Sequence, residues 1–430
     1  MTQLDIAATP VEAADRSPRR NLLARLGPGL ITGAADDDPS GIGTYSQVGA
    51  QFGYQLAWTM LFSYPLLVAI QAICARIGAV TGKGIAGNLR EHYPRPVLQA
   101  AVALLVIANV INLGADIGAM AETLGLLLPG PLLLYTFMFG LLSVVLEVWL
   151  SYDRYAGVLK WTTASLLAYV GVVLVSQVPL GPALRGIFLP AFTLDKAHTM
   201  GLVAVLGTTI SPYLFFWEAS QEVEELHAHK APPLRDAPAA AGADLDRIGV
   251  DNLAGMAYSQ AIAIFIIIAT ATTLHAHGVT QITSAAQAAQ ALRPIAGTFT
   301  FALFAAGIIG IGLLAVPVLA GSCAYAVSET FGWNEGLSRS ARDAKPFYAV
   351  IALATLGGFL LNLLRIDPMI ALYWAAVVNG LLAAPLIFVI MLLARNPKVM
   401  GELTIPRWLT LGGWAGTLVM AAVGVLFLVT

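Results

Sequence analysis

Residues 27–54, GPGLITGAADDDPSGIGTYSQVGAQFGY, combine an apolar segment with features that an uninterrupted membrane helix excludes. The consecutive carboxylates Asp36, Asp37 and Asp38 stand at its centre, and Pro39 and a glycine-rich run follow them. Hydrocarbon tolerates charge and unwound backbone at mid-depth only where they are buried in protein or line a watery cavity. The stretch therefore predicts a broken membrane helix with an ion or solute site at the break.

The composition of the whole chain indicates a polytopic membrane protein. Of its 430 residues, 58% are hydrophobic and 11% are charged, whereas soluble globular chains carry about 25% charged residues. The net charge of −2 argues against nucleic acid as a partner, and no protein partner is evident. Cys74 and Cys323 lie in apolar stretches, which disfavours a disulfide framework or a thiolate metal centre. No nucleophile–base pair or cofactor motif is visible, so we expect neither an enzyme nor a bound cofactor.

A length of roughly 20 apolar residues per span divides the chain into eleven predicted membrane helices. They cover about 27–51, 55–79, 97–126, 131–150, 155–177, 199–223, 252–275, 299–325, 347–364, 368–394 and 407–429. All but four of the 23 lysines and arginines then fall on the side of the N-terminus. This predicts an integral protein of the plasma (inner) membrane with a cytoplasmic N-terminus and the C-terminus outside. Residues 1–26 are predicted as a cytoplasmic tail, 27–430 as one transmembrane domain, and 224–251 as a mobile cytoplasmic loop.

The sixth predicted span repeats the irregularity of the first. Its centre, GTTISPY at residues 207–213, contains small polar residues and Pro212, which cannot donate a backbone hydrogen bond. Matched breaks in spans 1 and 6 favour an inverted-repeat transporter with its site at the repeat interface. The predicted repeats cover 27–177 and 199–394, with a loop at 178–198 and an eleventh span at 407–429.

Several segments resemble the Nramp family of divalent metal transporters, in order and spacing, over nearly the whole chain. They are Gly27-Pro28-Gly29, Asp38-Pro39, Gln47, Gly49-Ala50, Phe52-Gly53-Tyr54 with Trp58, ARIGAVTGK at 75–83, REHYP at 90–94 and NPKVMGE at 396–402. The resemblance implies an all-α membrane protein with the LeuT-like five-plus-five inverted repeat, discontinuous spans 1 and 6, and an eleventh span. It also implies a divalent metal ion as transported substrate and the lipid bilayer as surroundings.

The metal ligands that the resemblance implies are only partly present. The family's Asp-Pro-Gly-Asn reads Asp38-Pro39-Ser40-Gly41 here, so Gly41 replaces an amide ligand, and its Met-Pro-His reads Ser211-Pro212-Tyr213. Loss of the thioether removes the preference for transition metals, and oxygen ligands suit Mg²⁺, Mn²⁺ and Ca²⁺. The magnesium-transporting branch of the family also lacks the methionine. The candidate metal residues are Asp38, Ser211, Gly41, Asp37, Asn379 of the tenth span, and the carbonyls of Ala35 and Thr208.

Most of the residues that carry protons in the family are also replaced in this chain. Of an acidic pair in the family's third span only Asp116 remains, and Leu113 stands at the place of the other acid. The family's sixth-span histidines are replaced by Tyr213 and Glu218. Asp116 and Glu218 either carry protons or pair with polar neighbours such as Asn109 and Asn112, and both interpretations stay open. Asp36 is either a further candidate for proton coupling or a structural cap of the break. Either role must offset the high cost of an uncompensated charge in a dry pocket.

These observations favour a secondary transporter of a hard divalent cation, such as Mg²⁺ or Mn²⁺, that works by alternating access with weak or absent proton coupling. One alternative is a LeuT-fold symporter of a small organic solute, which the aromatic residues of the YLFFW run at 213–217 support. Another is a non-transporting receptor on the same scaffold, for which the 224–251 loop is the one suggestive feature.

Overall fold

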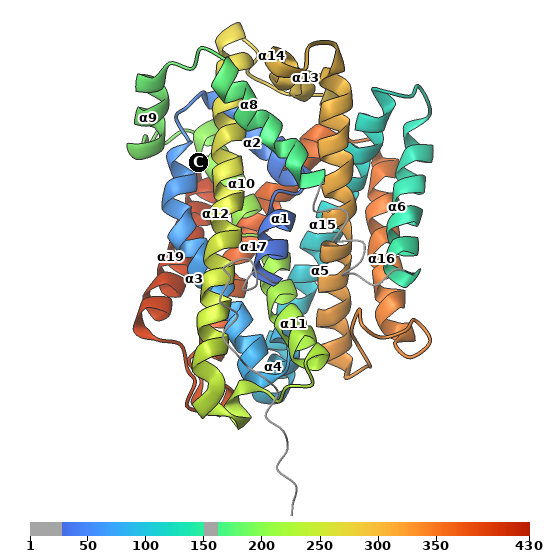
Figure 1. Ribbon diagram of the computed structural model, residues 1–430, viewed down its shortest axis with the longest axis vertical. Helices are drawn as coiled ribbons and strands as arrows, with labels where there is room; N and C mark the ends of the chain where they lie inside the picture. Colours follow the sequence, from blue (N-terminus) through green and yellow to red (C-terminus); the bar gives the residue numbers. More distant parts are fainter. Residues whose placement is uncertain (1–27, 150–161) are drawn as a thin grey trace, which may run out of the picture.

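The computed structural model describes residues 28–149 and 162–430, and within these ranges the chain is helical without β-strands (Figure 1). The predicted N-terminal tail lies outside the described residues, as do the end of the fourth predicted span and the start of the fifth. The first half comprises α1 Pro28–Asp36, α2 Pro39–Phe52, α3 Trp58–Thr81, α4 Ile85–His92, α5 Arg95–Gly125, α6 Leu132–Trp149, the 3₁₀ helix η2 Thr162–Leu166 and α8 Leu167–Val175.

The second half repeats this order of long helices. It comprises α10 Lys196–Thr209, α11 Pro212–Ala228, α12 Ala241–Thr273, α15 Thr300–Phe331, α16 Lys345–Leu361 and α17 Pro368–Ala394, and the chain ends with α19 Arg407–Val429. Short helices connect them: α9 Leu180–Phe188, η3 Leu234–Asp236, η4 Pro238–Ala240, η5 His275–His277, α13 Ala285–Ala289, η6 Gln290–Leu292, α14 Arg293–Ala296, η7 Gly297–Phe299, η8 Asn362–Leu364 and α18 Pro397–Met400. Figure 1 places α9, α13 and α14 at one end of the bundle and α4 at the other.

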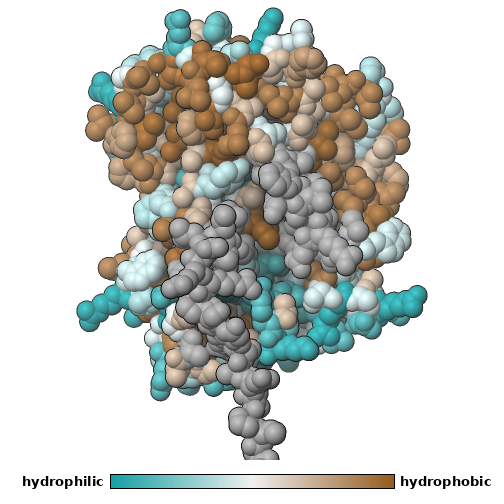
Figure 2. All heavy atoms as spheres, in the orientation of Figure 1, coloured by the Kyte–Doolittle hydropathy of each residue, from teal (hydrophilic) through white to brown (hydrophobic). Residues whose placement is uncertain are grey.

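Nine helical stretches of the described residues are long and apolar enough to cross a membrane. The broken sixth span is among them as Lys196–Ala228, whereas the first, with three aspartates at its break, is not. Part of the fifth predicted span lies outside the described residues. Figure 2 shows apolar side chains over the upper part of the face in view and hydrophilic ones gathered at the lower end. Large apolar side chains such as Leu141, Leu353 and Leu418 are exposed, as lipid-facing residues are.

The predicted cytoplasmic loop is shorter in the structure than in the sequence analysis. α11 continues to Ala228, and α12 begins at Ala241 rather than near residue 252. Four of the residues 241–251 are charged, so the sequence analysis assigned this segment to a loop. In the structure it is helical, and its buried face includes Ala241 and Ile248. An ion pair of 2.7 Å between Arg247 of α12 and Glu222 of α11 joins these two helix ends.

The halves of the broken spans pack closely on their neighbours through glycine. A Cβ atom on Gly33 of α1 would lie 2.3 Å from the carbonyl oxygen of Gly255 in α12. A Cβ atom on Gly207 of α10 would lie 2.1 Å from the carbonyl oxygen of Ala376 in α17. The helix backbones therefore approach each other directly, as small residues allow in membrane bundles. This fixes where the two breaks lie.

Candidate ion-binding site

Both breaks have the same local construction. Two residues separate α1 from α2, and two separate α10 from α11, and each second helix begins with a proline. Proline suits this position because its fixed φ angle matches a helix and its missing N–H leaves no unpaired donor. The residues before the prolines, Asp38 and Ser211, are the N-caps of α2 and α11.

Asp38 is held by the first turn of its own helix. Its Oδ1 accepts hydrogen bonds from the backbone N–H of Gly41 at 2.6 Å and from the hydroxyl of Ser40 at 2.8 Å. The side chain is 1% exposed. A side-chain oxygen bonded to these first-turn groups fixes the carboxylate at the positive end of α2. Gly41 therefore contributes a backbone donor that orients Asp38, rather than a side-chain ligand.

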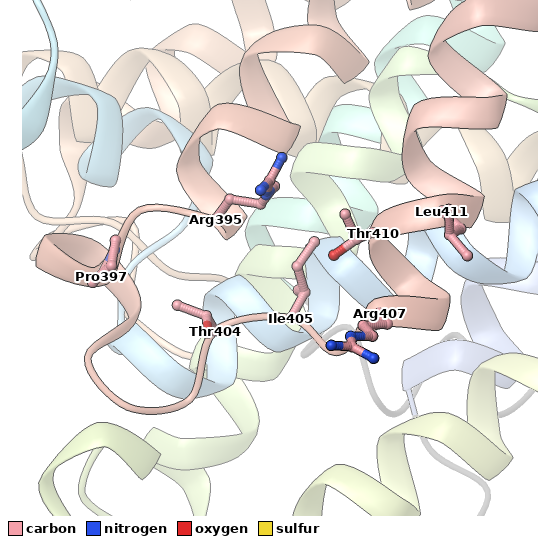
Figure 3. Close-up of a pocket in the computed structure, with 7 residues that line it drawn as sticks. All are labelled: Arg395, Pro397, Thr404, Ile405, Arg407, Thr410 and Leu411. Atoms are coloured by element: carbon pink, nitrogen blue, oxygen red, sulfur yellow. The ribbon is translucent and has the colours of Figure 1, made fainter.

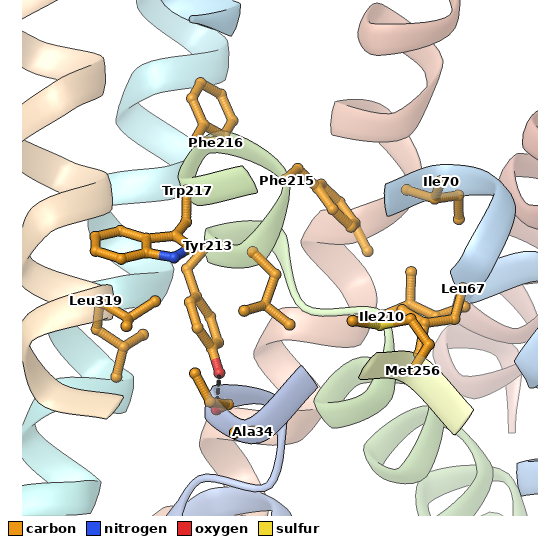
Figure 4. Close-up of a cluster of buried hydrophobic side chains, with 14 of the residues drawn as sticks. Ala34, Leu67, Ile70, Ile210, Tyr213, Phe215, Phe216, Trp217, Met256 and Leu319 are labelled. Atoms are coloured by element: carbon orange, nitrogen blue, oxygen red, sulfur yellow. Dashed lines mark hydrogen bonds between the residues drawn. The ribbon is translucent and has the colours of Figure 1, made fainter. Parts of the chain in front are cut away.

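The two breaks face each other across the centre of the protein. The Tyr213 hydroxyl, from α11, donates to the carbonyl oxygen of Ala35 at 2.9 Å and to Oδ2 of Asp38 at 3.2 Å. Figure 4 shows this side chain reaching from α11 to α1. On the α2 and α10 side, the hydroxyls of Ser40 and Thr208 are 3.4 Å apart. Backbone and side-chain oxygens of both breaks thus gather around Asp38.

The hydroxyl of Ser211, a residue of the second break, bonds back to the end of α10. Its hydroxyl donates to the carbonyl oxygens of Gly207 at 2.9 Å and Thr208 at 2.7 Å. The hydroxyl proton is used in this way, so the lone pairs of the Ser211 oxygen remain for another partner. The Thr208 carbonyl oxygen accepts this hydrogen bond, so one lone pair of that oxygen is occupied.

α5 supplies a contact that the sequence analysis did not assign. The amide nitrogen of Asn112 donates to Oδ2 of Asp38 at 3.0 Å. Asp116, one turn further along α5, lies beside the backbone amide of Ser40. Both residues are fully buried, and neither oxygen of Asp116 has a hydrogen-bond partner of standard geometry among the described residues. The four-residue spacing of Asn112 and Asp116, which places them on one face of a helix, is the signal that could have grouped them.

The aspartate triplet does not converge on one point. Asp36 and Asp37 both accept from the Ser259 hydroxyl of α12, at 2.7 and 3.3 Å. In residues 28–149 and 162–430 no group of three or more histidine, cysteine, aspartate or glutamate residues is placed to hold a metal ion. A metal near Asp38 would therefore take at least some of its other ligands from neutral oxygens and water.

Two other predicted site residues, Asn379 and Glu218, form no hydrogen bond with Asp38 or its partners. Asn379 is buried in α17, next to Gly380, which packs on α10, and its amide nitrogen has no hydrogen-bond partner in the described part of the chain. Glu218 of α11 accepts from the hydroxyl of Thr32 in α1 and, at 3.1 Å, from the amide of Asn252 in α12. The polar partners of Glu218 are thus different from those that the sequence suggested.

Glu218 belongs to a small polar cluster near the start of α1. The backbone N–H of Gly29, in the first turn of α1, donates to Oδ2 of Asp251 in α12 at 2.8 Å. We call the Gly29–Asp251, Thr32–Glu218 and Asn252–Glu218 contacts the α1 latch. The latch ties α1 to α11 and α12 on the side of the site away from α2.

Comparison with known proteins decides the family. The family model described as "Nramp: Natural resistance-associated macrophage protein-like" matches residues 29–430. The chain belongs to the Nramp family. A curated relative, the divalent metal cation transporter MntH of Klebsiella pneumoniae, is 28% identical over 413 residues, which cover 94% of this chain and 93% of that protein. The resemblance seen in the sequence is thereby confirmed.

Solved structures agree with this Nramp membership at the level of the fold. The manganese transporter of Eremococcus coleocola, in complex with an aromatic bis-isothiourea substituted compound, has a TM-score of 0.74 at 16% identity, covering 95% of this chain and 86% of that one. Mhp1, a nucleobase-cation-symport-1 family transporter in a closed conformation, has a TM-score of 0.54 at 14% identity, covering 94% and 92%. The predicted LeuT-like fold is confirmed. These Nramp relatives are integral membrane transporters and not enzymes.

Proposed function

We propose that this protein is a secondary transporter that moves a hard divalent cation, Mg²⁺ or Mn²⁺, across the inner membrane by alternating access. The observation that carries the proposal is Asp38, a buried carboxylate held between two helix breaks that contribute oxygen atoms. A carboxylate, hydroxyls and carbonyls are ligands of hard cations, and Mg²⁺ keeps several of its waters when it binds. Named relatives that transport divalent metals and manganese support the choice of substrate.

The donor set supports a hard ion in preference to a soft one. Asp38, Ser211 and the carbonyls of Ala35 and Thr208 present oxygen only, and the two cysteines of the chain are fully buried elsewhere, in α3 and α15. Thiolate and thioether ligands are what select softer metals. Weak or absent proton coupling is part of the proposal, because Glu218 is engaged by Thr32 and Asn252 in the α1 latch.

The orientation is part of the same proposal. An N-terminus in the cytoplasm places the α1 latch on the cytoplasmic side of Asp38 and the contact between α2 and α10 on the outer side. The hydrophilic lower end of the molecule in Figure 2, which includes the end of α11, is then the cytoplasmic face. This agrees with the excess of lysine and arginine on that side.

The organic-solute alternative loses its main support. Phe215, Phe216 and Trp217 are at most 1% exposed, and Figure 4 shows Trp217 beside Leu319 of α15 within the apolar core. These side chains contribute packing rather than the walls of a substrate cavity. The 224–251 segment, which suggested a receptor, is largely built into α11 and α12.

The proposal is tested by an ion panel in proteoliposomes. We expect the wild-type protein to take up Mn²⁺ and Mg²⁺, with Cd²⁺ a poor competitor and little acidification of the lumen. Ser211→Met, which supplies a thioether, is expected to raise Cd²⁺ uptake relative to Mg²⁺ by about tenfold or more. Ser211→Ala is the matched control for loss of the hydroxyl alone. Absence of metal flux in the wild type would overturn the proposed function, and unchanged selectivity in Ser211→Met would overturn the assignment of Ser211.

A second prediction concerns the hydroxyl of Tyr213, which bonds two of the proposed ligand oxygens. A metal ion that uses Asp38 Oδ2 and the Ala35 carbonyl must replace these hydrogen bonds. Because a hydrogen bond to a charged group contributes about 1.5–3 kcal/mol, we expect Tyr213→Phe to tighten Mn²⁺ binding by roughly tenfold. Isothermal titration of the purified protein measures this. Weaker binding in Tyr213→Phe would show instead that the hydroxyl is itself a ligand.

A further inference from the structure

A cavity of about 420 Å³ lies between the end of α17 and the start of α19, away from the ion site. Its walls are formed by Arg395, Pro397, Thr404, Ile405, Arg407, Thr410 and Leu411 (Figure 3). α17 ends at Ala394 and α19 begins at Arg407, so both arginines lie where membrane helices emerge from the hydrocarbon. Lipid headgroups are found at this depth of a bilayer.

The positive charge of this cavity is not neutralised by the described protein. Arg395 and Arg407 are exposed, and neither forms an ion pair with a carboxylate of residues 28–149 or 162–430. Figure 3 shows them on either side of Ile405 and Thr410. Glu402, in the same loop, does not line the cavity. Two arginines without a carboxylate partner among the described residues line one cavity, and arginine binds phosphate through paired N–H donors.

The loop that forms the cavity is fixed in place. The guanidinium of Arg76, in α3, donates to the carbonyl oxygens of Leu403 at 3.0 Å and Thr404 at 3.2 Å. The Asn396 side chain accepts from the backbone N–H of Lys398 and caps α18. The backbone N–H of Ile405 donates to the carbonyl oxygen of Ala394, which closes the loop. A cavity held in this way is formed before any ligand arrives, so little ordering cost opposes binding.

The surface beside the cavity is apolar and faces the membrane. Trp408 and Leu411, in the first turns of α19, are 58% and 73% exposed. Further along, Phe388 of α17 and Trp414 of α19 form an edge-to-face pair with ring centroids 5.6 Å apart. An amphipathic ligand can therefore place its phosphate at the arginines and its acyl chains along α17 and α19. A free phosphate ion would gain nothing from this second feature.

We propose that this cavity binds the phosphate-bearing headgroup of an anionic membrane phospholipid. The site is independent of the proposed metal transport, since none of its residues contacts Asp38 or its partners. Basic pockets between membrane helices are suited to anionic headgroups, because each arginine near the surface contributes about a fivefold gain in affinity. The ligand thus joins α17 to α19 at the membrane boundary.

The test uses the full-length protein, purified in detergent, stripped of lipid and then titrated with phosphatidylglycerol or phosphatidylcholine, with binding measured by native mass spectrometry. We expect wild type to bind phosphatidylglycerol in preference to phosphatidylcholine, and Arg395→Gln/Arg407→Gln to bind phosphatidylglycerol about 30-fold more weakly. Arg339→Gln/Arg342→Gln is the matched control, because it removes two exposed arginines from the loop before α16, and it should bind like wild type.

A second measurement separates a lipid site from a site for a free anion. Phosphatidylglycerol is expected to raise the thermal unfolding temperature of wild type and of the control variant, but not of Arg395→Gln/Arg407→Gln. Millimolar inorganic phosphate is expected to give no such rise. Equal lipid retention in all variants, or stabilisation by inorganic phosphate equal to that by the lipid, would overturn the proposal. Neither result depends on whether the protein transports metal.

Discussion

Replacing Asp38 by asparagine is expected to reduce metal uptake by about 100-fold or more. Asparagine has the same shape and keeps an oxygen that can accept from Gly41 and Ser40, so the break between α1 and α2 should remain folded. What is lost is the negative charge at the centre of the proposed site, together with the oxygen that accepts from Asn112 and Tyr213. Changes to groups that only support metal ligands cost 10–100-fold, and removal of the charged ligand itself should cost at least as much.

The measurement for Asp38→Asn is uptake of Mn²⁺ and Mg²⁺ into proteoliposomes, normalised to the amount of monodisperse protein. Asp246→Asn supplies a matched control, because the same chemical change is made at an exposed position of α12. Asp36→Asn is informative as a third variant, since Asp36 is directed at Ser259 rather than at the opposite break. Full uptake by Asp38→Asn would refute the assigned site.

The second large effect is expected at Glu218. Glu218→Ala removes the acceptor of two buried hydrogen bonds that join α1, α11 and α12. Each such loss costs about 1–3 kcal/mol, so the state with a closed α1 latch should lose at least tenfold in population relative to an open one. Opening of α1 would expose residues on its buried side, among them Ala34, which is 8% exposed in the closed structure.

Thiol labelling of an Ala34→Cys variant measures this opening. The native cysteines, Cys74 and Cys323, are both fully buried, so the background should be low. We expect labelling to be about tenfold faster when Glu218→Ala is added. Glu225→Ala, at a partly exposed position of the same helix, should leave the rate unchanged. Glu218→Gln, which can still accept from Thr32, should label slowly. Equal rates in all variants would show that the latch does not hold α1.

The sequence was most informative about the two breaks. Asp38-Pro39 and Ser211-Pro212 are local patterns, because a proline at the first position of a helix acts within one turn, as does the capping side chain of Asp38. The spacing of apolar segments then gave most of the spans. The helical start of α12 was missed because four of the residues 241–251 are charged. Arg247 among them pairs with Glu222 of α11, which the sequence alone does not show.

Partnerships across the bundle could not be predicted in the same way. Nothing local distinguishes Asn112, which bonds Asp38 from 74 positions away, from any other polar residue in a membrane helix. Ser259 is equally inconspicuous, although its hydroxyl donates to Asp36 and Asp37 at the first break. Such contacts depend on which helix faces come together, and a single sequence does not encode that in any short window.

The glycine contact between α1 and α12 has a mechanical consequence. Where Gly33 meets Gly255, backbone lies directly against backbone, because a Cβ atom on Gly33 would lie 2.3 Å from the carbonyl oxygen of Gly255. We therefore expect α1 to move as one rigid helix once the hydrogen bonds of the α1 latch are broken. Because the two residues between α1 and α2 are not helical, α1 can change its angle to α2 without a helix having to unwind.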